Sequence, residues 1–391
     1  MKPETDSRIV LTLDAGGTNL KFSAIRGNRL LLEPIYIPTE ADNLDRCLAN
    51  IVEGFNRVRG HCPEPPVAIS FAFPGPADYP AGIIGDLPNL PAFRGGVALG
   101  PMLQEKFGVP VFINNDGDLF VYGEAIAGFL PYINDLLEQA GSPKRYKNLF
   151  GVTLGTGFGG GIVRNGELFI GDNSAAGEAW LLRNKLDPRL NAEEGACIRA
   201  VRRVYARKAG SENGDSPHWP ERPDGCFAQR GTVPVFAPEP KDICDIAAGK
   251  AAGDRAAAVE AFRCLGEVAG DAIAQALTMI DGLAVIGGGI SAASALFMPA
   301  LVDAVNDVYL KDGGPLRRLV PRAFNAEDPA QLGEFLKGQK RTLAVPGSTR
   351  TVQYDPLQRT AIGLSRLGTS EAVAIGAYAY AIRQLTITEV Q

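Results

Sequence analysis

Two glycine-rich segments have the composition of loops that bind phosphate. Residues 14–18 (Asp-Ala-Gly-Gly-Thr) interrupt one run of strand-forming residues, and residues 155–161 (Gly-Thr-Gly-Phe-Gly-Gly-Gly) interrupt another. Consecutive glycines leave backbone N–H groups uncovered and let them approach an oxyanion that a Cβ atom would keep away. A plain hairpin turn explains either segment alone about equally well, but the recurrence favours phosphate. The candidate phosphate-binding residues are Gly16, Gly17, Thr18, Gly155, Thr156 and Gly157.

Asp14 ends the first strand-forming run, directly before its glycine turn. A carboxylate at that point is suited to hold Mg²⁺ through water, because magnesium keeps much of its hydration shell. A side chain that caps the turn is the alternative. We therefore expect Asp14 to be the magnesium-binding residue of the first glycine loop.

A third glycine cluster, Gly287-Gly288-Gly289, follows the apolar run 283–286 and precedes an apolar helical pattern at 291–305. A nucleoside or its phosphates can rest against the start of such a helix. A tight turn from strand to helix is the simpler explanation of this cluster taken alone. It is included among the expected nucleotide-binding residues because it accompanies the other two glycine segments.

Asn115 and Asp116 follow an apolar run at 110–113 that we expect to be a buried strand. Side chains at the C-terminal end of such a strand project toward the ligand crevice of an α/β fold. A carboxylate there can accept a hydroxyl proton while a phosphoryl group transfers in line, so Asp116 is the candidate base. The rival interpretation is a helix N-cap before residues 119–129, for which Asp118 is the stronger candidate because it lies nearer the apolar run.

The elements around these residues form two similar arrangements. Residues 9–13, 19–25 and 29–38 have the pattern of strands, separated by the first glycine turn and a tight turn at Gly27-Asn28. A dinucleotide-binding fold or a P-loop would continue into a helix after its glycines, so this order excludes both. The same order of strand, glycine turn and strand returns at 148–170, which indicates an internal duplication.

Strands alternate with helices, which predicts an α/β fold of two related domains that face each other across a cleft. Apolar residues at helical spacing between Leu44 and Val58 predict one such helix, with Thr39 as its N-cap. We expect a small domain at 1–117 that includes a C-terminal helix at 370–391, and a large domain at 118–369. Segments 209–240 and 311–350 are rich in proline, glycine and charge without a clear period, and are predicted to be loops or insertions.

Composition excludes several classes of function. The chain has 391 residues, of which 46% are hydrophobic and 21% charged, as expected for a globular protein of about two domains. A net charge of −5 argues against a nucleic-acid partner, which requires an excess of lysine and arginine. Apolar runs are too short for a membrane span, and the six cysteines contain no C-x-x-C pair. With no signal-like stretch after Met1, we expect a cytoplasmic protein.

Seven motifs occur together in a specific order. They are LDAGGTN-K (residues 13–21), PGP (74–76), PNLPAF (88–93), NND (114–116), LGTGFGGGIV (154–163), AAGE (175–178) and IGGG (286–289). This set resembles the ROK family of repressors, open reading frames of unknown function and sugar kinases. The resemblance implies the actin/hexokinase/Hsp70 ATPase fold, with two related domains, and ATP-dependent phosphorylation of a sugar hydroxyl.

The resemblance also assigns roles to individual residues. It implies that Asp116 is the base, that Asp14 and the glycine motifs bind the nucleotide, and that a homodimer forms. Sugar hydroxyls would be bound by Asn89, Asn115, Glu178 and Glu193, the last preferred over Glu194. Glucose is the first expectation for the sugar.

Two features depart from the family pattern. Leu181 stands where the family commonly places a histidine, which removes one hydrogen-bonding group near the sugar. The family's zinc-binding run of three cysteines is represented by Cys197 alone, and one thiol without that histidine cannot close a tetrahedral site. We therefore expect no zinc.

Other functions stay open. The main alternative is a sugar-binding regulatory protein of the same family with weak or no kinase activity, although such a protein would not need the base Asp116. Only eight residues precede Ile9, so we expect no helix-turn-helix segment for binding DNA. A relative that phosphorylates a carboxylate is disfavoured, because Asp116, Glu178 and Glu193 would repel an acidic substrate.

Overall fold

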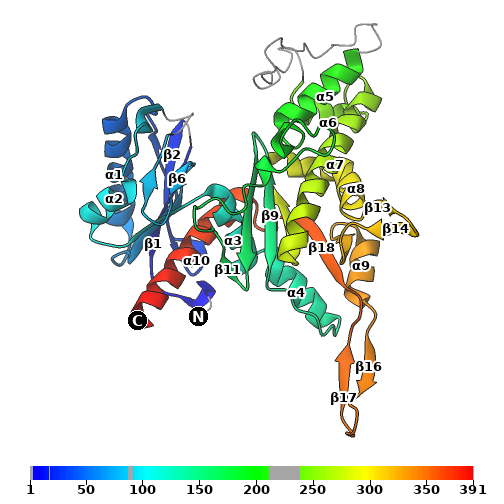
Figure 1. Cartoon of the computed structure of the whole chain (residues 1–391). Coiled ribbons are helices and arrows are strands. Elements are labelled where there is room, and N and C mark those ends of the chain that lie inside the picture. The colour runs from blue at the N-terminus through cyan, green and yellow to red at the C-terminus, as the bar shows by residue number, and fades with distance from the viewer. Residues whose placement is uncertain (1–2, 17, 87–90, 211–237, 391) are drawn as a thin grey trace. The chain divides into compact units, whose positions relative to one another are not determined.

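The computed structural model describes residues 3–16, 18–86, 91–210 and 238–390 (Figure 1). The chain forms two compact units. The first comprises Met1–Gly151, Gly160–Glu178 and Ser365–Gln391, and the second comprises Val152–Gly159 and Ala179–Leu364. The first unit includes the C-terminal helix and extends beyond the expected boundary at residue 117. Among the described residues, no helix has the length and apolar character needed to cross a membrane.

Six strands form the sheet of the first unit, in the order β3-β2-β1-β5-β8, with β4 paired to β2. Their bounds are β1 Val10–Ala15, β2 Asn19–Arg26, β3 Arg29–Leu30, β4 Ile35–Pro38, β5 Ala68–Ala72 and β8 Val111–Asn114. Strands β1, β5 and β8 run parallel, and Asp14 is level with Ala72, which is level with Asn114. The C-terminal ends of these three strands therefore meet at one edge of the sheet, where the candidate base was expected.

Helices cover both faces of this sheet, as Figure 1 shows with α1 and α2 on one side and α10 on the other. The helices are α1 Leu44–His61, α2 Leu99–Phe107 and α10 Thr369–Val390. Beneath α1, the rings of Phe22, Phe55 and Phe71 are fully buried and contact one another. Beneath α10, Tyr378 and Ile382 pack on Val10 of β1. Both faces being buried explains why β1 and β5 are mostly apolar, with Thr12 and Ser70 as buried polar exceptions.

Helix α3, Asp116–Ile126, begins directly after β8 and is followed by α4, Phe129–Gln139. Its N-cap is Asn115, whose Oδ1 accepts a hydrogen bond of 2.8 Å from the Gly117 N–H. The prediction that Asp118 caps this helix was therefore wrong. The prediction of Thr39 as the cap of α1 was also wrong, because Asn43 accepts the bond from Arg46 N–H.

A second six-stranded sheet has the order β11-β10-β9-β12-β18-β15. Its strands are β9 Leu149–Leu154, β10 Phe158–Arg164, β11 Glu167–Leu168, β12 Leu283–Gly287, β15 Arg322–Asn325 and β18 Arg359–Leu364. Three consecutive strands joined by turns are followed across the sheet by parallel strands, as in the first sheet. The expected α/β fold with two related halves is confirmed.

Long helices pack on one another in the second unit. They are α5 Ile198–Gly210, α6 Pro240–Ala247, α7 Arg255–Ile280, α8 Ser294–Val305 and α9 Pro329–Lys337. Glycines in α7 allow close contact with α8, because a Cβ on Gly266 would lie 2.4 Å from the carbonyl oxygen of Phe297.

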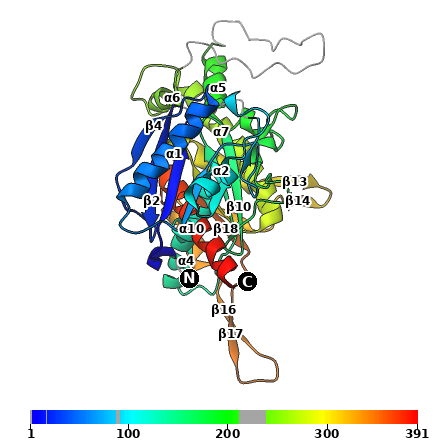
Figure 2. The same cartoon turned by 90° about the vertical axis from the view of Figure 1, so that its left-hand side faces the viewer.

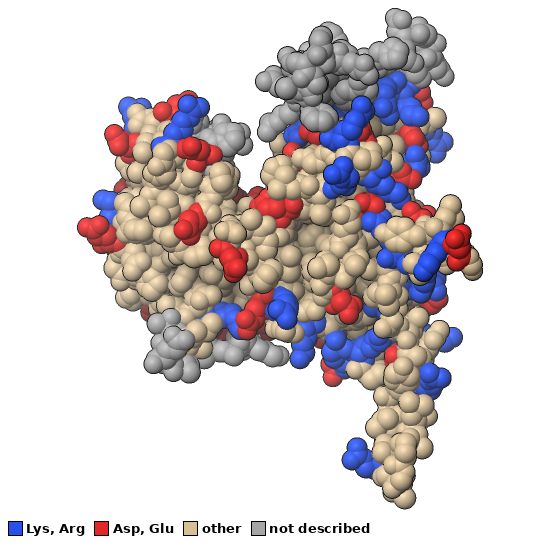
Figure 3. Space-filling view, viewed as in Figure 1, with Lys and Arg blue, Asp and Glu red and all other residues tan. Residues whose placement is uncertain are grey.

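The segment 311–350 is not the loop that its composition predicts. It contains β15, which joins the second sheet, and α9. Hairpins lie on either side, one of β13 Val308–Lys311 and β14 Gly314–Arg317, the other of β16 Arg341–Ala344 and β17 Thr351–Tyr354. Figure 2 shows the second hairpin extending away from the other elements, and Figure 3 shows that it presents few charges. Most of the other expected insertion, 209–240, lies outside the described residues.

Candidate active site

The first glycine loop joins β1 to β2 as a tight hairpin. The Gly16 N–H donates to the carbonyl of Asn19 over 3.1 Å, and a Cβ on Gly16 would lie 2.8 Å from that oxygen. Thr39 braces the loop, since its hydroxyl donates to the Gly16 carbonyl over 2.6 Å and its N–H donates to the Thr18 carbonyl over 3.0 Å. Glycine at 16 is therefore required by close backbone approach. Gly17 lies outside the described residues.

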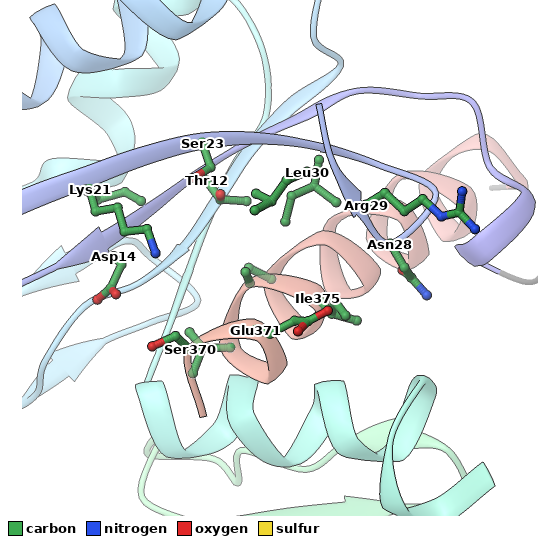
Figure 4. A pocket seen from close by; sticks show the side chains of 15 residues that line it. Thr12, Asp14, Lys21, Ser23, Asn28, Arg29, Leu30, Ser370, Glu371 and Ile375 are labelled. Atoms are coloured by element: carbon green, nitrogen blue, oxygen red, sulfur yellow. The ribbon is translucent and has the colours of Figure 1, made fainter. Parts of the chain in front are cut away.

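Asp14 is exposed beside this loop and lies opposite Lys21 in the antiparallel pairing of β1 with β2. Both residues line a cavity of about 430 Å³ that β1 and β2 share with α10. Figure 4 shows the two side chains next to each other at one end of this cavity, near Ser370, with Asn28 and Arg29 at the other. The exposed carboxylate of Asp14 has the hard oxygen donors that Mg²⁺ prefers, which fits the expected role.

Asn115 and Asp116 lie where β8 passes into α3. While its Oδ1 caps α3, the Asn115 amide donates to the Tyr79 hydroxyl over 3.3 Å, and that hydroxyl donates to the Phe73 carbonyl over 3.0 Å. The second amide hydrogen of Asn115 is left for another acceptor. Asp116 Oδ1 also accepts from the Gly117 N–H, over 2.8 Å.

The carboxylate of Asp116 has lost hydration although solvent still reaches its side chain. Protein atoms crowd around it, and this desolvation raises its pKa above the ordinary value for aspartate. The Gly117 N–H bond lowers the pKa, and the charge of Asp14 raises it. A carboxylate that solvent reaches and whose pKa is raised is suited to act as a general base.

Four glycines hold the start of α3 against β10 and the loop that ends at Glu178. A Cβ on Gly117 would lie 2.6 Å from the Gly160 carbonyl oxygen, and one on Gly161 would lie 3.0 Å from the Asp118 Cα. A Cβ on Gly177, whose φ is +84°, would lie 2.9 Å from the Gly161 Cα. All of these residues belong to the first unit. This close packing brings Glu178 near the carboxyl groups of Asp116 and Asp118.

The second glycine loop lies in the second unit, between β9 and β10. Glu193 Oε2 accepts from the Phe158 N–H over 3.2 Å, while its Oε1 accepts from Arg199 over 2.9 Å. Arg199 also donates to the Thr156 carbonyl over 3.0 Å. A Cβ on Gly157 would lie 2.7 Å from Glu193 Oε2. Glu193 and Arg199 therefore fix the conformation of this loop.

The third glycine cluster shows why glycine is needed at its centre. Gly288 has a φ of +88°, and a Cβ there would lie 2.2 Å from the Leu154 carbonyl oxygen. The Ser291 hydroxyl donates to the Gly288 carbonyl over 2.7 Å, and residues Gly289–Ala293 form a short 3-10 helix. This geometry explains the glycine at 288 by the tight turn that it forms. A role of Gly287, Gly288 and Gly289 in binding nucleotide stays a prediction.

Comparison with known proteins decides the family. The ROK family profile matches residues 10–197. The crystal structure of a glucokinase from Parabacteroides distasonis is 50% identical, with a TM-score of 0.85 over 98% of this chain and 99% of that one. The chain belongs to the ROK family. Among curated relatives, a Thermotoga maritima glucokinase is 25% identical over 77% of this chain and 88% of its own length.

A second kind of ROK relative acts on another sugar. An N-acetyl-D-glucosamine kinase of Vibrio cholerae serotype O1 is 31% identical over 47% of this chain. The chain spans 55% of the length of that relative and of the N-acetyl-D-glucosamine kinase of Vibrio parahaemolyticus.

The departures from the ROK pattern can be located. Leu181 is 60% exposed, and Cys197 is a buried free thiol whose pKa is raised by burial. In the part of the chain that the structure describes, no group of three or more His, Cys, Asp or Glu side chains is placed to hold a metal ion. The lack of a zinc site stays a prediction.

Sequence reasoning did not find every residue around the site. Thr39, Tyr79 and Arg199 brace the loops and the N-cap through contacts between residues far apart in the chain, which no local pattern reveals. Asp118 was assigned to a cap, and no local pattern distinguishes that role from a buried acid, because side chains two residues apart in a helix do not face each other. Asn89 lies outside the described residues.

Proposed function

We propose that this ROK protein transfers the terminal phosphoryl group of ATP to a hydroxyl group of a hexose. The observation that carries the proposal is Asp116, a carboxylate at the start of α3 that solvent reaches and whose pKa is raised by lost hydration. In this step Asp116 accepts the hydroxyl proton, the sugar oxygen bonds to the phosphorus, and the bond from phosphorus to ADP breaks.

The nucleotide would be bound by the glycine loops. Backbone N–H groups of the loop with Gly16, Gly17 and Thr18 and of the loop with Gly155, Thr156 and Gly157 would contact its phosphates. Gly287, Gly288 and Gly289 would lie beside the nucleoside. Asp14 would hold Mg²⁺ through water, and the ion would neutralise charge on the phosphates.

The sugar would be bound by Asn89, Asn115, Glu178 and Glu193. Asn115 retains an amide hydrogen for a sugar hydroxyl, and Glu178 lies in the same packed cluster as Asp116. We propose glucose as the first substrate to test, supported by the glucokinase that is 50% identical, and N-acetyl-D-glucosamine as the second. From the family resemblance we also propose that the protein is cytoplasmic, forms a homodimer and binds no zinc. Light scattering on the purified protein tests whether it is a dimer.

A coupled assay of ADP release over a panel of sugars tests the function. We expect glucose-dependent ADP formation in the wild type, and a loss of about 10²–10⁴-fold in kcat for Asp116→Asn. Binding of a fluorescent ATP analogue should be nearly unchanged in that variant, because Asp116 is proposed to act on the sugar proton. Asp135→Asn, at an exposed position on α4, serves as the matched control.

Two outcomes would contradict the proposal. Near-normal turnover in Asp116→Asn would remove Asp116 from the role of base. Sugar binding by calorimetry without any ADP formation in the wild type would favour the alternative, a sugar-binding regulatory protein.

A further inference from the structure

Asp118 is a buried carboxyl group that the proposed reaction does not use. It lies in the first turn of α3 with only 3% of its surface exposed. Its Oδ1 atom is buried without a hydrogen-bond partner in the described part of the chain. In an ionised carboxylate this Oδ1 atom would lack both water and a hydrogen-bond donor from the described residues, which is energetically costly.

The titratable groups whose charges affect Asp118, or that are affected by it, come from four segments. Among the described residues, none of these groups is positively charged. Asp116 belongs to the same helix, and Glu178 ends the loop that Gly177 packs against Gly161. Two phenols complete the surroundings, Tyr380 of α10 and Tyr79, which follows β6 Ala77–Asp78. Three carboxyl groups therefore share one packed corner of the first unit.

Negative charge on the neighbouring carboxyl groups opposes the ionisation of Asp118. Burial, followed by the charges of Glu178 and Asp116, raises the pKa of Asp118 well above the ordinary value. The pKa of Asp116 is raised mainly by desolvation, and Asp118 is not among the charges that affect it, so Asp116 ionises first. Environments that separate the pKa values of neighbouring carboxyls are how proteins assign them different roles.

We propose that Asp118 is a positioning residue that remains a neutral carboxylic acid beside Asp116 and Glu178. Its hydroxyl hydrogen supplies a donor to a carboxylate or a sugar hydroxyl in this corner. Because a neutral Asp118 carries no charge, it adds no electrostatic repulsion beside Asp116 and Glu178. The inference rests on the function proposed above, since it assigns Asp118 to the site where Asp116 is the base.

The pH dependence of the Asp118→Asn variant tests this role in the kinase assay. Asparagine keeps the shape and a donor but cannot ionise, so we expect kcat near neutral pH within about threefold of the wild type. The wild type should lose about tenfold in kcat per pH unit once pH rises above the raised pKa of Asp118, and the variant should lack this decline. Asp135→Asn should keep the wild-type decline. An unchanged decline in Asp118→Asn would overturn the inference.

A stability measurement separates this inference from the proposed function. Because the folded-state pKa of Asp118 is raised, its contribution to stability is present at low pH and lost as pH rises toward that pKa. The denaturant midpoint of the wild type should therefore fall relative to that of Asp118→Asn as pH rises. A constant difference between the two would refute the role of Asp118, even in an active kinase. A wild type inactive on every sugar would instead refute the proposed function.

A second variant covers the case in which Asp118→Asn does not fold. Glu178→Gln removes the largest charge that raises the pKa of Asp118, so the pH-dependent loss of stability should end at lower pH. An unshifted loss would contradict the proposed link between Glu178 and Asp118.

Discussion

Asp116 and Asp118 lie two residues apart in the first turn of α3, yet their side chains have different surroundings. Solvent reaches Asp116, whose Oδ1 accepts the Gly117 N–H, whereas Asp118 is buried with an unpartnered oxygen. The start of α3 therefore carries two carboxyl groups with different proposed roles. Asp116 would accept a proton from the substrate, and Asp118 would keep its proton. Burial and hydrogen bonding, more than residue type, separate the two roles.

The raised pKa of Asp116 predicts where activity is lost in acid. A general base must be ionised, so kcat/KM should fall as pH decreases through the pKa of Asp116, which lies above the ordinary value of 3.8. The pH profile of kcat/KM with saturating MgATP measures this limb, and circular dichroism over the same range controls for unfolding. Full activity down to about pH 4 would contradict the assignment of Asp116 as the base.

Residue-level prediction from the sequence succeeded where local pattern and chemistry coincide. A glycine turn between strands identifies the loop at Gly16, because close backbone approach needs glycine whatever the rest of the fold does. The prediction for Asp118 failed because a cap and a buried acid look alike in one sequence. Which of them occurs depends on Asn115, which takes the cap position, and on Glu178, which lies far away in the chain.

At the scale of elements, the contact between α3 and α10 depends on two glycines, one on each helix, that pack against the backbone of the other helix. A Cβ on Gly123 would lie 2.0 Å from the Ala372 carbonyl oxygen, and one on Gly376 would lie 2.0 Å from that of Leu119. The two backbones therefore approach more closely than any larger residue allows. Because α3 carries Asp116 at its start, this contact positions the candidate base.

Replacing these glycines should weaken the first unit. Gly376→Ala and Gly123→Ala force the helices apart, so we expect each to lower the free energy of unfolding by about 1–3 kcal/mol or more. Gly60→Ala is the matched control, because Gly60 lies in α1 with no atom within 4 Å of its Cβ position. That change should raise stability by about 0.5–1 kcal/mol through higher helix propensity. Urea unfolding measures all three, and equal effects of Gly376→Ala and Gly60→Ala would contradict the packing argument.

Elements were predicted well where an apolar period marks a buried face, as in α1. The segment 311–350 was not, because its hairpins have little buried surface to produce such a period. All residues of β16 and β17 are exposed, and only their mutual pairing defines them. Strand β15 is recognisable only through its parallel pairing with β18, which comes later in the chain. Pairing between distant segments is not encoded in a local pattern.

At the scale of the whole molecule, each compact unit is assembled from segments distant in sequence. The first unit takes its last segment, Ser365–Gln391, from the C-terminus. In that segment Tyr378 is fully buried against β1, and its hydroxyl accepts the Gly27 N–H over 2.9 Å. The sheet that carries Asp14 therefore has an exposed apolar face until the last helix of the chain has packed on it.

Removing α10 should consequently unfold the first unit. A variant that ends at Leu364 exposes the apolar face around Val10 and Ala68, so we expect loss of its cooperative unfolding transition and rapid proteolysis within residues 1–151. The control replaces the β16–β17 hairpin, whose residues are all exposed, with an Asn-Gly turn, and should unfold near the wild-type midpoint. Calorimetry and limited proteolysis measure both variants. A shortened chain with a wild-type transition would show that α10 is dispensable, because the first sheet would then be stable with one face uncovered.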